Sequence, residues 1–310
     1  MRHALPKQQR GVAVITALLL TTLAVTIVAS LFWQQQVQVR SIENQRLQLQ
    51  KQWILRGALD WSSLILREDA KHSSVDTLDE PWAVPLAETR LDQYVENGQS
   101  DTEDSDAILT GSISDAQALF NLRNMNVNGI INPRAVTGFE RLLNSQRMDV
   151  KLAQATANLM AAAQTSPANP NQAGAVQPIN LTQVDDLLAV QGFTPSMLVL
   201  LKALVIFLPQ TTPINVNTAP AEVLAAQFNL SLSDAAVLIK SRDTATFKDL
   251  ADFNTRLSNK NIAASADQAA VTTNYFLVNG KIKMGRAALS MQALINRNVG
   301  KTELIWIREY

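Results

Sequence analysis

Residues 10–33 read RGVAVITALLLTTLAVTIVASLFW, and this stretch decides how the rest of the chain is placed. No charged residue falls between Val12 and Trp33. At 1.5 Å per helical residue the run spans roughly 30 Å, the thickness of the hydrocarbon core of a bilayer. The residues before it carry only basic charges, and the first acid after it is Glu43. This asymmetry predicts a cytoplasmic amino terminus and an exported remainder.

Hydropathy alone leaves two fates open for this apolar run. A cleavable signal peptide would be cut near Val28-Ala29-Ser30, whereas a retained anchor would stay on the mature protein. Retention is favoured because the run is longer than the ~7–15 apolar residues of a signal peptide, and because helix-forming sequence continues to Lys71 without Pro. We therefore predict one helix from Val12 to about Ala70, roughly 85 Å long. Its apolar face toward a soluble head is predicted to consist of Ile54, Ala58, Trp61 and Ile65.

The apolar run begins directly after a glycine. The leader, residues 1–11, is basic and ends at Gly11, so a peptidase acting there would leave the membrane helix on the protein. A basic leader, a Gly and a long continuing helix resemble the class III signal of type IV pilins and type II secretion pseudopilins. The resemblance implies cleavage between Gly11 and Val12 by a prepilin peptidase, and N-methylation of Val12. It also implies a single-pass protein of the Gram-negative cell inner membrane with a periplasmic head.

Thr16 stands at mature position five in this register, where most members of the superfamily carry Glu. A carboxylate inside a membrane is costly unless it is paired, and in the family that Glu pairs with the terminal amine of a neighbouring subunit. A threonine hydroxyl instead bonds back to its own helix. The missing Glu resembles the minor pseudopilin K family of type II secretion, which implies a subunit at the end of the filament. The alternative is that Thr16 is an ordinary membrane residue and the cleavage register is different.

The remainder of the chain has the pattern of an α+β protein. We predict a strand at Ala107–Ile113, a strand-like segment at Phe120–Met125, a hairpin turn at Asn279-Gly280 and further strands within 286–308. With the resemblance, this gives a type IV pilin-like fold: a long helix, an antiparallel sheet and a large inserted all-α domain. The predicted domains are a leader at 1–11, a transmembrane helix at 12–33, a periplasmic spine helix at 34–72, a pilin-like head at 73–125 and 270–310, and the insertion at 126–269.

Helical segments fill the predicted insertion, among them an apolar helix at Met197–Leu208 that is expected in the core. The stretch INVNTA at 214–219, followed by two short helices and FKDLADF at 247–253, resembles helix-hairpin-helix (SAM-like) modules. It also resembles the helical insert of the pseudopilin K family. EPWA at 80–83 and the pair DAQ and FNL.N within 115–124 resemble the same family.

A helix-hairpin-helix module binds DNA through a Gly-rich hairpin whose backbone N–H groups approach a phosphate. The hairpin at 228–233 holds no Gly, and the nearby cations Lys240, Arg242 and Lys248 are offset by three Asp residues. The scaffold is therefore expected without its phosphate site, and no nucleic acid is expected as a partner. A membrane-anchored periplasmic protein that binds and takes up DNA stays the alternative function.

An acidic run, Asp101-Thr102-Glu103-Asp104-Ser105-Asp106, concentrates the oxygen ligands that Ca²⁺ prefers. It lacks the Gly and the bidentate Glu of an EF-hand loop at the required spacing, so a solvated acidic loop is the competing interpretation. Because pseudopilin heads can bind calcium, the resemblance keeps Asp101, Glu103, Asp104 and Asp106 as candidate ligands. No other cofactor is predicted.

Composition argues against catalysis and against binding of a polyanion. The 310 residues carry 27 basic and 27 acidic side chains and no Cys, and of the two His residues His3 would leave with the leader. No Walker, Rossmann or GxSxG pattern occurs. The resemblance instead implies a non-enzymatic minor pseudopilin that starts or caps a pseudopilus for export of folded proteins across the outer membrane. Its implied partners are the I and J pseudopilins, with H as a further candidate, the prepilin peptidase and the inner-membrane secretion platform.

Overall fold

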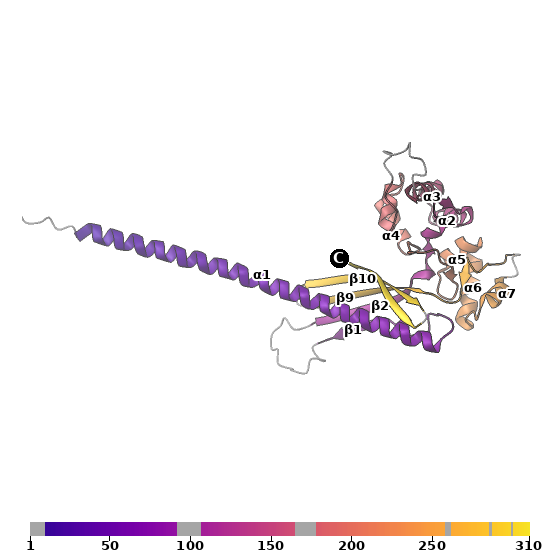
Figure 1. Ribbon diagram of the computed structural model, residues 1–310, viewed down its shortest axis with the longest axis horizontal. Helices are drawn as coiled ribbons and strands as arrows, with labels where there is room; N and C mark the ends of the chain where they lie inside the picture. The colour runs from indigo at the N-terminus through magenta and orange to yellow at the C-terminus, as the bar shows by residue number, and fades with distance from the viewer. Residues whose placement is uncertain (1–9, 92–106, 165–177, 258–261, 285–286, 299) are drawn as a thin grey trace, which may run out of the picture. The chain divides into compact units, whose positions relative to one another are not determined.

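The computed structural model describes residues 10–91, 107–164, 178–257, 262–284, 287–298 and 300–310 (Figure 1). The chain divides into two compact units, Met1–Arg56 and Gly57–Tyr310. The acidic run at 101–106, with its four candidate calcium ligands, lies outside the described residues.

Helix α1 (Arg10–His72) is a single helix of 63 residues, as the unbroken helix-forming sequence predicts. In the first unit every side chain from Val12 to Trp33 is exposed, and the helix is long and apolar enough to cross a membrane. Its threonine hydroxyls donate to carbonyl oxygens one turn earlier, so they add no unpaired polar group to this apolar surface. The segment therefore has the properties of a lipid-exposed helix.

A five-stranded antiparallel sheet forms the frame of the second unit. The strands are β1 (Leu86–Arg90), β2 (Ala107–Asp115), β9 (Tyr275–Met284), β10 (Ala287–Asn298) and β11 (Lys301–Glu309), in the order β1-β2-β9-β10-β11. In the central pair, Ala107 lies opposite Met284 and Asp115 opposite Phe276. Neighbouring strands β2 and β9 are thus far apart in sequence, and the helical domain is inserted between them.

The inserted domain holds six α-helices among its described residues, and Figure 1 shows them gathered at one end of the sheet. Its large core includes two aromatic clusters: Phe120 stacks on Phe139 at 6.1 Å between ring centroids, and Phe253 contacts Phe228 and Phe247 at 5.2 and 5.1 Å. The helices are α2 (Pro133–Ser145), α3 (Lys151–Gln164), α4 (Pro195–Leu201), α5 (Ala221–Phe228), α6 (Leu232–Thr244) and α7 (Leu250–Leu257).

Short elements join the sheet to these helices. The 3-10 helices are η1 (Pro81–Ala83), η3 (Ala116–Ala118), η4 (Leu122–Met125) and η6 (Val184–Ala189). The two-residue strands pair β3 (Phe120–Asn121) with β6 (Val205–Ile206), β4 (Asn126–Val127) with β5 (Ile130–Ile131), and β7 (Ile214–Asn215) with β8 (Ala269–Ala270). The pairs β3–β6 and β7–β8 each join segments that are distant in sequence. They hold the beginning and the end of the insertion against its middle part.

The hairpin predicted at Asn279-Gly280 is wrong. Both residues lie inside β9, where Asn279 is opposite Ser112 on one side and Gln292 on the other. Gly280 is opposite Gly111 of β2, and a Cβ at Gly111 would lie 3.2 Å from the carbonyl oxygen of Asn279. The glycine here permits close approach of two strands and does not mark a turn.

Three further expectations need correction. Phe120–Met125 is not a strand, because only Phe120 and Asn121 pair and a 3-10 helix follows. The helix expected at 197–208 ends at Leu201, and its Val199 is 71% exposed. On α1 the buried residues in the second unit are Leu59 and Leu66, one position beyond the predicted stripe, and Trp61 is 55% exposed. A one-position shift rotates the buried face by about 100° around the helix, and the spacing of apolar residues fits both faces because Leu59 and Leu66 are also apolar.

Candidate functional site

The predicted processing and assembly residues lie in the first turns of α1. Gly11 and Val12 belong to the helix, which begins at Arg10. The Thr16 hydroxyl lies 3.1 Å from the carbonyl oxygen of Val12 and 3.0 Å from that of Ala13, and it donates to both in a shared bond. Its donor is therefore used within its own helix, as expected for a hydroxyl at this position. The residue offers no charge to a neighbouring amine.

A buried ionic cluster lies where α1 ends, and the sequence analysis did not find it. Carboxylate oxygens of Asp69, Asp76 and Glu80 lie within 4.8 Å of one another. Arg297 of β10 donates to Asp69 at 2.7 Å and to Asp76, and also to the backbone carbonyl of Thr273 at 3.2 Å. Burial raises the pKa of Asp69 and of Asp76, and the Arg297 guanidinium opposes both shifts.

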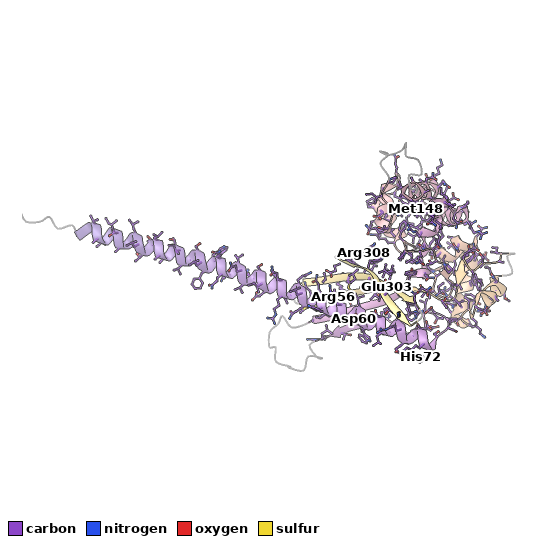
Figure 2. All side chains as sticks on the ribbon, viewed as in Figure 1. Arg56, Asp60, His72, Met148, Glu303 and Arg308 are labelled. Carbon is purple, nitrogen blue, oxygen red and sulfur yellow. The ribbon has the colours of Figure 1, made fainter. Side chains whose placement is uncertain are left out.

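Each carboxylate of this cluster has hydrogen-bond partners within the protein, so the cluster works as a clamp. Glu80 accepts hydrogen bonds from the backbone N–H of Thr77 at 2.9 Å and from Nε1 of Trp82 at 2.8 Å. Trp82 in turn packs edge-on against Phe276 of β9, with 5.2 Å between ring centroids. His72, the last residue of α1 and labelled in Figure 2, is exposed. The clamp thus fastens the end of α1 to the sheet.

A second polar cluster joins strand β2 to the inserted domain, and its centre is Asp115. Asp115 accepts hydrogen bonds from Nδ2 of Asn215 at 2.8 Å, from the Thr218 hydroxyl at 2.6 Å and from the backbone N–H of Gln117 at 2.7 Å. The other Asn215 amide hydrogen goes to the backbone carbonyl of Asp76 at 3.1 Å. Burial raises the pKa of Asp115 to about 6, although these donors oppose the shift.

The DAQ and FNL.N motifs supply a row of polar side chains at this junction. Gln117 donates to the carbonyl of Pro213 at 3.1 Å and accepts from the N–H of Asn274 at 2.8 Å. Asn121 donates to the carbonyl of Gln210 at 2.8 Å, and Asn124 exchanges two hydrogen bonds with the backbone of Thr212. The side-chain amides of Gln117, Asn121 and Asn124 thus hydrogen-bond backbone groups that water does not reach. This need explains why uncharged polar residues stand at these positions.

The INVNTA stretch at 214–219 also supplies a side-chain amide that hydrogen-bonds the backbone of a distant segment. Asn217 donates to the carbonyl of Phe247 at 3.0 Å and accepts from its N–H at 2.9 Å, so it ties the stretch to the segment before α7. Arg242 of α6 is buried and donates to the carbonyls of Val216 at 2.9 Å and Ala219 at 2.7 Å. Burial lowers the pKa of Arg242. The guanidinium therefore faces the protein interior.

The helix-hairpin-helix resemblance holds for the scaffold and fails for the phosphate site. Helices α5 and α6 are bent by 117° at the break between them. Asn229 takes the left-handed conformation at the end of α5, with φ of 55°, a position for which Gly is otherwise favoured. Ser231 caps α6 by accepting from the N–H of Asp234 at 3.1 Å. With Arg242 turned inward, Lys240 and Lys248 are the exposed members of the basic set named from the sequence.

Comparison with known proteins gives a single family. Models described as type II secretion system (T2SS), protein K match residues 118–210 and 214–274. The type II secretion system protein K of Pseudomonas aeruginosa is 29% identical over 89% of this chain and 85% of its own length. That of Klebsiella pneumoniae is 26% identical over 98% and 97%.

A solved structure has the same fold. It is the GspK-GspI-GspJ complex from the Type 2 Secretion System of enterotoxigenic Escherichia coli, matched with a TM-score of 0.63 and 20% identity. The match covers 87% of this chain and 99% of the matched chain. The family models coincide with the inserted domain and its polar junction, and the relatives extend the likeness over nearly the whole sequence, α1 included. The chain is thus similar over nearly its whole length to protein K of the type II secretion system, and these matches support its assignment as a minor pseudopilin of that kind.

Proposed function

We propose that this minor pseudopilin sits at the tip of the pseudopilus with pseudopilins I and J, where it starts or caps assembly for export of folded proteins. The observation that carries the proposal is the nearly full-length likeness to two protein K relatives, together with the fold shared with a chain of the solved GspK-GspI-GspJ complex. Thr16 supports an end position, since a hydroxyl bonded within its own helix offers no partner to a terminal amine. The H pseudopilin and the inner-membrane platform are further partners in this proposal.

The proposal assigns each part of the chain a task. Residues 1–11 are a leader that a prepilin peptidase removes before Val12, which is then N-methylated. Residues 12–33 anchor the protein in the inner membrane and bundle with partner helices, and 34–72 continue as the spine. The head, 73–125 and 270–310, carries the inserted domain at 126–269, whose bulk obstructs addition of another subunit. The protein acts through binding and not catalysis, which accords with its composition.

The mature amino terminus tests the processing step. Coexpression with a prepilin peptidase should shorten the chain by about a kilodalton, and the first residue should be methylated Val12. A Gly11→Val variant should keep its leader, because the peptidase then meets a branched side chain. An unchanged mass, or loss of about thirty residues as for an ordinary signal peptide, contradicts the proposal.

Partner binding and placement test the assembly step. The detergent-solubilised protein should capture coexpressed I and J pseudopilins and should not retain duplex DNA. Capture of DNA in place of I and J would favour the uptake protein named above as the alternative. On assembled pseudopili, a label on this chain should mark one end of each fibre, and labels spaced along the shaft would contradict a tip position.

A further inference from the structure

Asp115 has an unusual setting for a carboxylate. It ends strand β2, the residue is buried, and three of its partners come from outside its own strand: Gln117, Asn215 and Thr218. All three partners are donors, so they suit an ionised carboxylate, yet among the described residues no cationic side chain pairs with it. Two of the donors belong to the inserted domain, which makes this carboxyl the point where strand and insertion meet.

The Thr218 hydroxyl can hydrogen-bond the Asp115 carboxyl in both of its protonation states, as a donor to the carboxylate and as an acceptor from the acid. It now lies 2.6 Å from Oδ2 of Asp115 and 3.3 Å from the backbone carbonyl oxygen of Asn215. When a proton from water adds to Oδ2, the acid becomes a donor, and Thr218 Oγ1 is the acceptor already in place. The hydroxyl hydrogen of Thr218 then turns to the Asn215 carbonyl. The contact between Asp115 and Thr218 is kept while its donor and acceptor exchange roles.

We propose that Asp115, Asn215 and Thr218 form a proton-dependent latch between strand β2 and the inserted domain, which closes more firmly when the carboxyl is protonated. Ionisation is opposed by burial without a cation and is relieved when the junction opens to water. Protonation removes this penalty and retains the hydrogen bonds. The latch does not depend on the position of the protein in a pseudopilus.

The neighbouring ionisable groups do not replace Asp115 in this role. Asp76, Asp69 and Arg297 form the clamp on the α1 side. Asp76 reaches the latch through its backbone carbonyl, which accepts from Asn215, and through Thr273, whose N–H donates to the Asp76 carboxylate at 2.7 Å. On β9, burial and then Glu303 raise the pKa of Tyr275, so its phenol stays neutral below pH ~10. For Asp115 itself, burial and hydrogen bonds from Thr218, Thr273, Asn215 and Gln117 set the pKa.

The sign and size of the effect follow from linkage. A carboxyl whose pKa is about 6 in the closed junction and 3.8 when free favours the closed state most at low pH. This preference is lost as pH rises from about 4 to about 6. Between about pH 5 and about pH 7.5, the opening equilibrium should increase about tenfold.

The absence of Cys from the chain permits a direct test with single thiols. Val216→Cys places a thiol beside the latch at a fully buried site, and Val136→Cys places a matched thiol in the buried face of α2. Thiol labelling rates of the full-length protein in detergent, divided by those of the denatured chain at the same pH, give protection factors. From about pH 5 to about pH 7.5 protection at position 216 should fall about tenfold, and at 136 less than about twofold.

Asp115→Asn assigns the pH dependence to this carboxyl. In that background the fall at position 216 should shrink to about threefold or less, the remainder coming from Asp69 and Asp76. Equal falls at 216 and 136, no fall at 216, or an unchanged fall in Asp115→Asn would each overturn the latch. If Asp115→Asn folds poorly, the pH dependence of the protection factor at position 216, compared with that at position 136 in the chain that keeps Asp115, still tests the latch.

Discussion

Replacing Arg297 with Met tests the clamp that holds the end of α1 to the sheet. The Arg297 side chain is 8% exposed; its guanidinium donates to Asp69 and Asp76 and lies over the Phe276 ring with 4.6 Å to the centroid. Methionine retains most of the apolar stem and its packing. The variant therefore removes the cation and leaves two carboxylates that are nearly fully buried without a countercharge.

Breaking a buried ion pair by removing one partner costs about 3–5 kcal/mol. For a unit of this size that corresponds to a fall in Tm of roughly 6–20 °C. Burial already raises the pKa of Asp69 and of Asp76, and without Arg297 both pKa values rise further. Acid pH then neutralises the two carboxyls and restores stability. The loss should therefore be greater at about pH 8 than at about pH 5.

Thermal unfolding of the full-length protein, followed by tryptophan fluorescence at both pH values, measures this loss. Arg308→Met is the matched control, since Arg308 (labelled in Figure 2) also covers an aromatic ring, with 4.1 Å to the centroid of Trp306, but lies on the edge strand β11. That control should cost at most about 1 kcal/mol. Adding Asp76→Asn should recover part of the Arg297→Met loss. A loss below about 1 kcal/mol, or an equal loss at both pH values, would refute the clamp.

Three simpler substitutions test other parts of the fold by thermal unfolding. Gly57→Ala should stabilise the protein by about 0.5–1 kcal/mol, because Gly57 lies inside α1 and its new Cβ would meet no atom within 4 Å; a lower Tm would contradict this. Gly192→Ala should cost about 1–3 kcal/mol, since φ is +113° and the Cβ would lie 2.8 Å from Leu152; an unchanged Tm would show that the turn adapts. Arg242→Met should cost about 2–4 kcal/mol through its two carbonyl bonds, whereas exposed Lys240→Met should change stability by less than about 0.5 kcal/mol; similar losses would argue against an interior role for Arg242.

The long elements could be predicted from the sequence because their signals are local. Helix α1 follows from an apolar run that continues without Pro, and helices at the positions of α6 and α7 follow from the resemblance to helix-hairpin-helix modules. The α+β class and the inserted helical domain also agree with the solved fold. Errors arose where pairing partners are distant in sequence. Asn279-Gly280 has the local pattern of a turn, yet the strands on either side force it to continue as β9.

The polar clusters were harder to predict than the elements. Asp69, Asp76 and Arg297 become partners only after α1, β10 and the loop between α1 and β1 are assembled, and no spacing in the sequence links them. Asp115 and Gln117 did stand in a motif that resembled the family. Their chemistry stayed hidden because hydrogen bonds to Asn215 and Pro213 connect positions 100 and 96 residues apart.

The insertion between β2 and β9 has a consequence for how the sheet forms during folding. Ser114 and Leu277 face each other in the sheet but are separated by 163 positions. Until β9 emerges, the edge of β2 lacks its neighbour and is open to association with other chains. If the helical insert folds before β9 is available, that interval is shorter, because the hydrogen bonds of Asp115 to Asn215 and of Gln117 to Pro213 hold the two ends of the insert close together. In that order of folding the insert is the internal template on which the sheet closes.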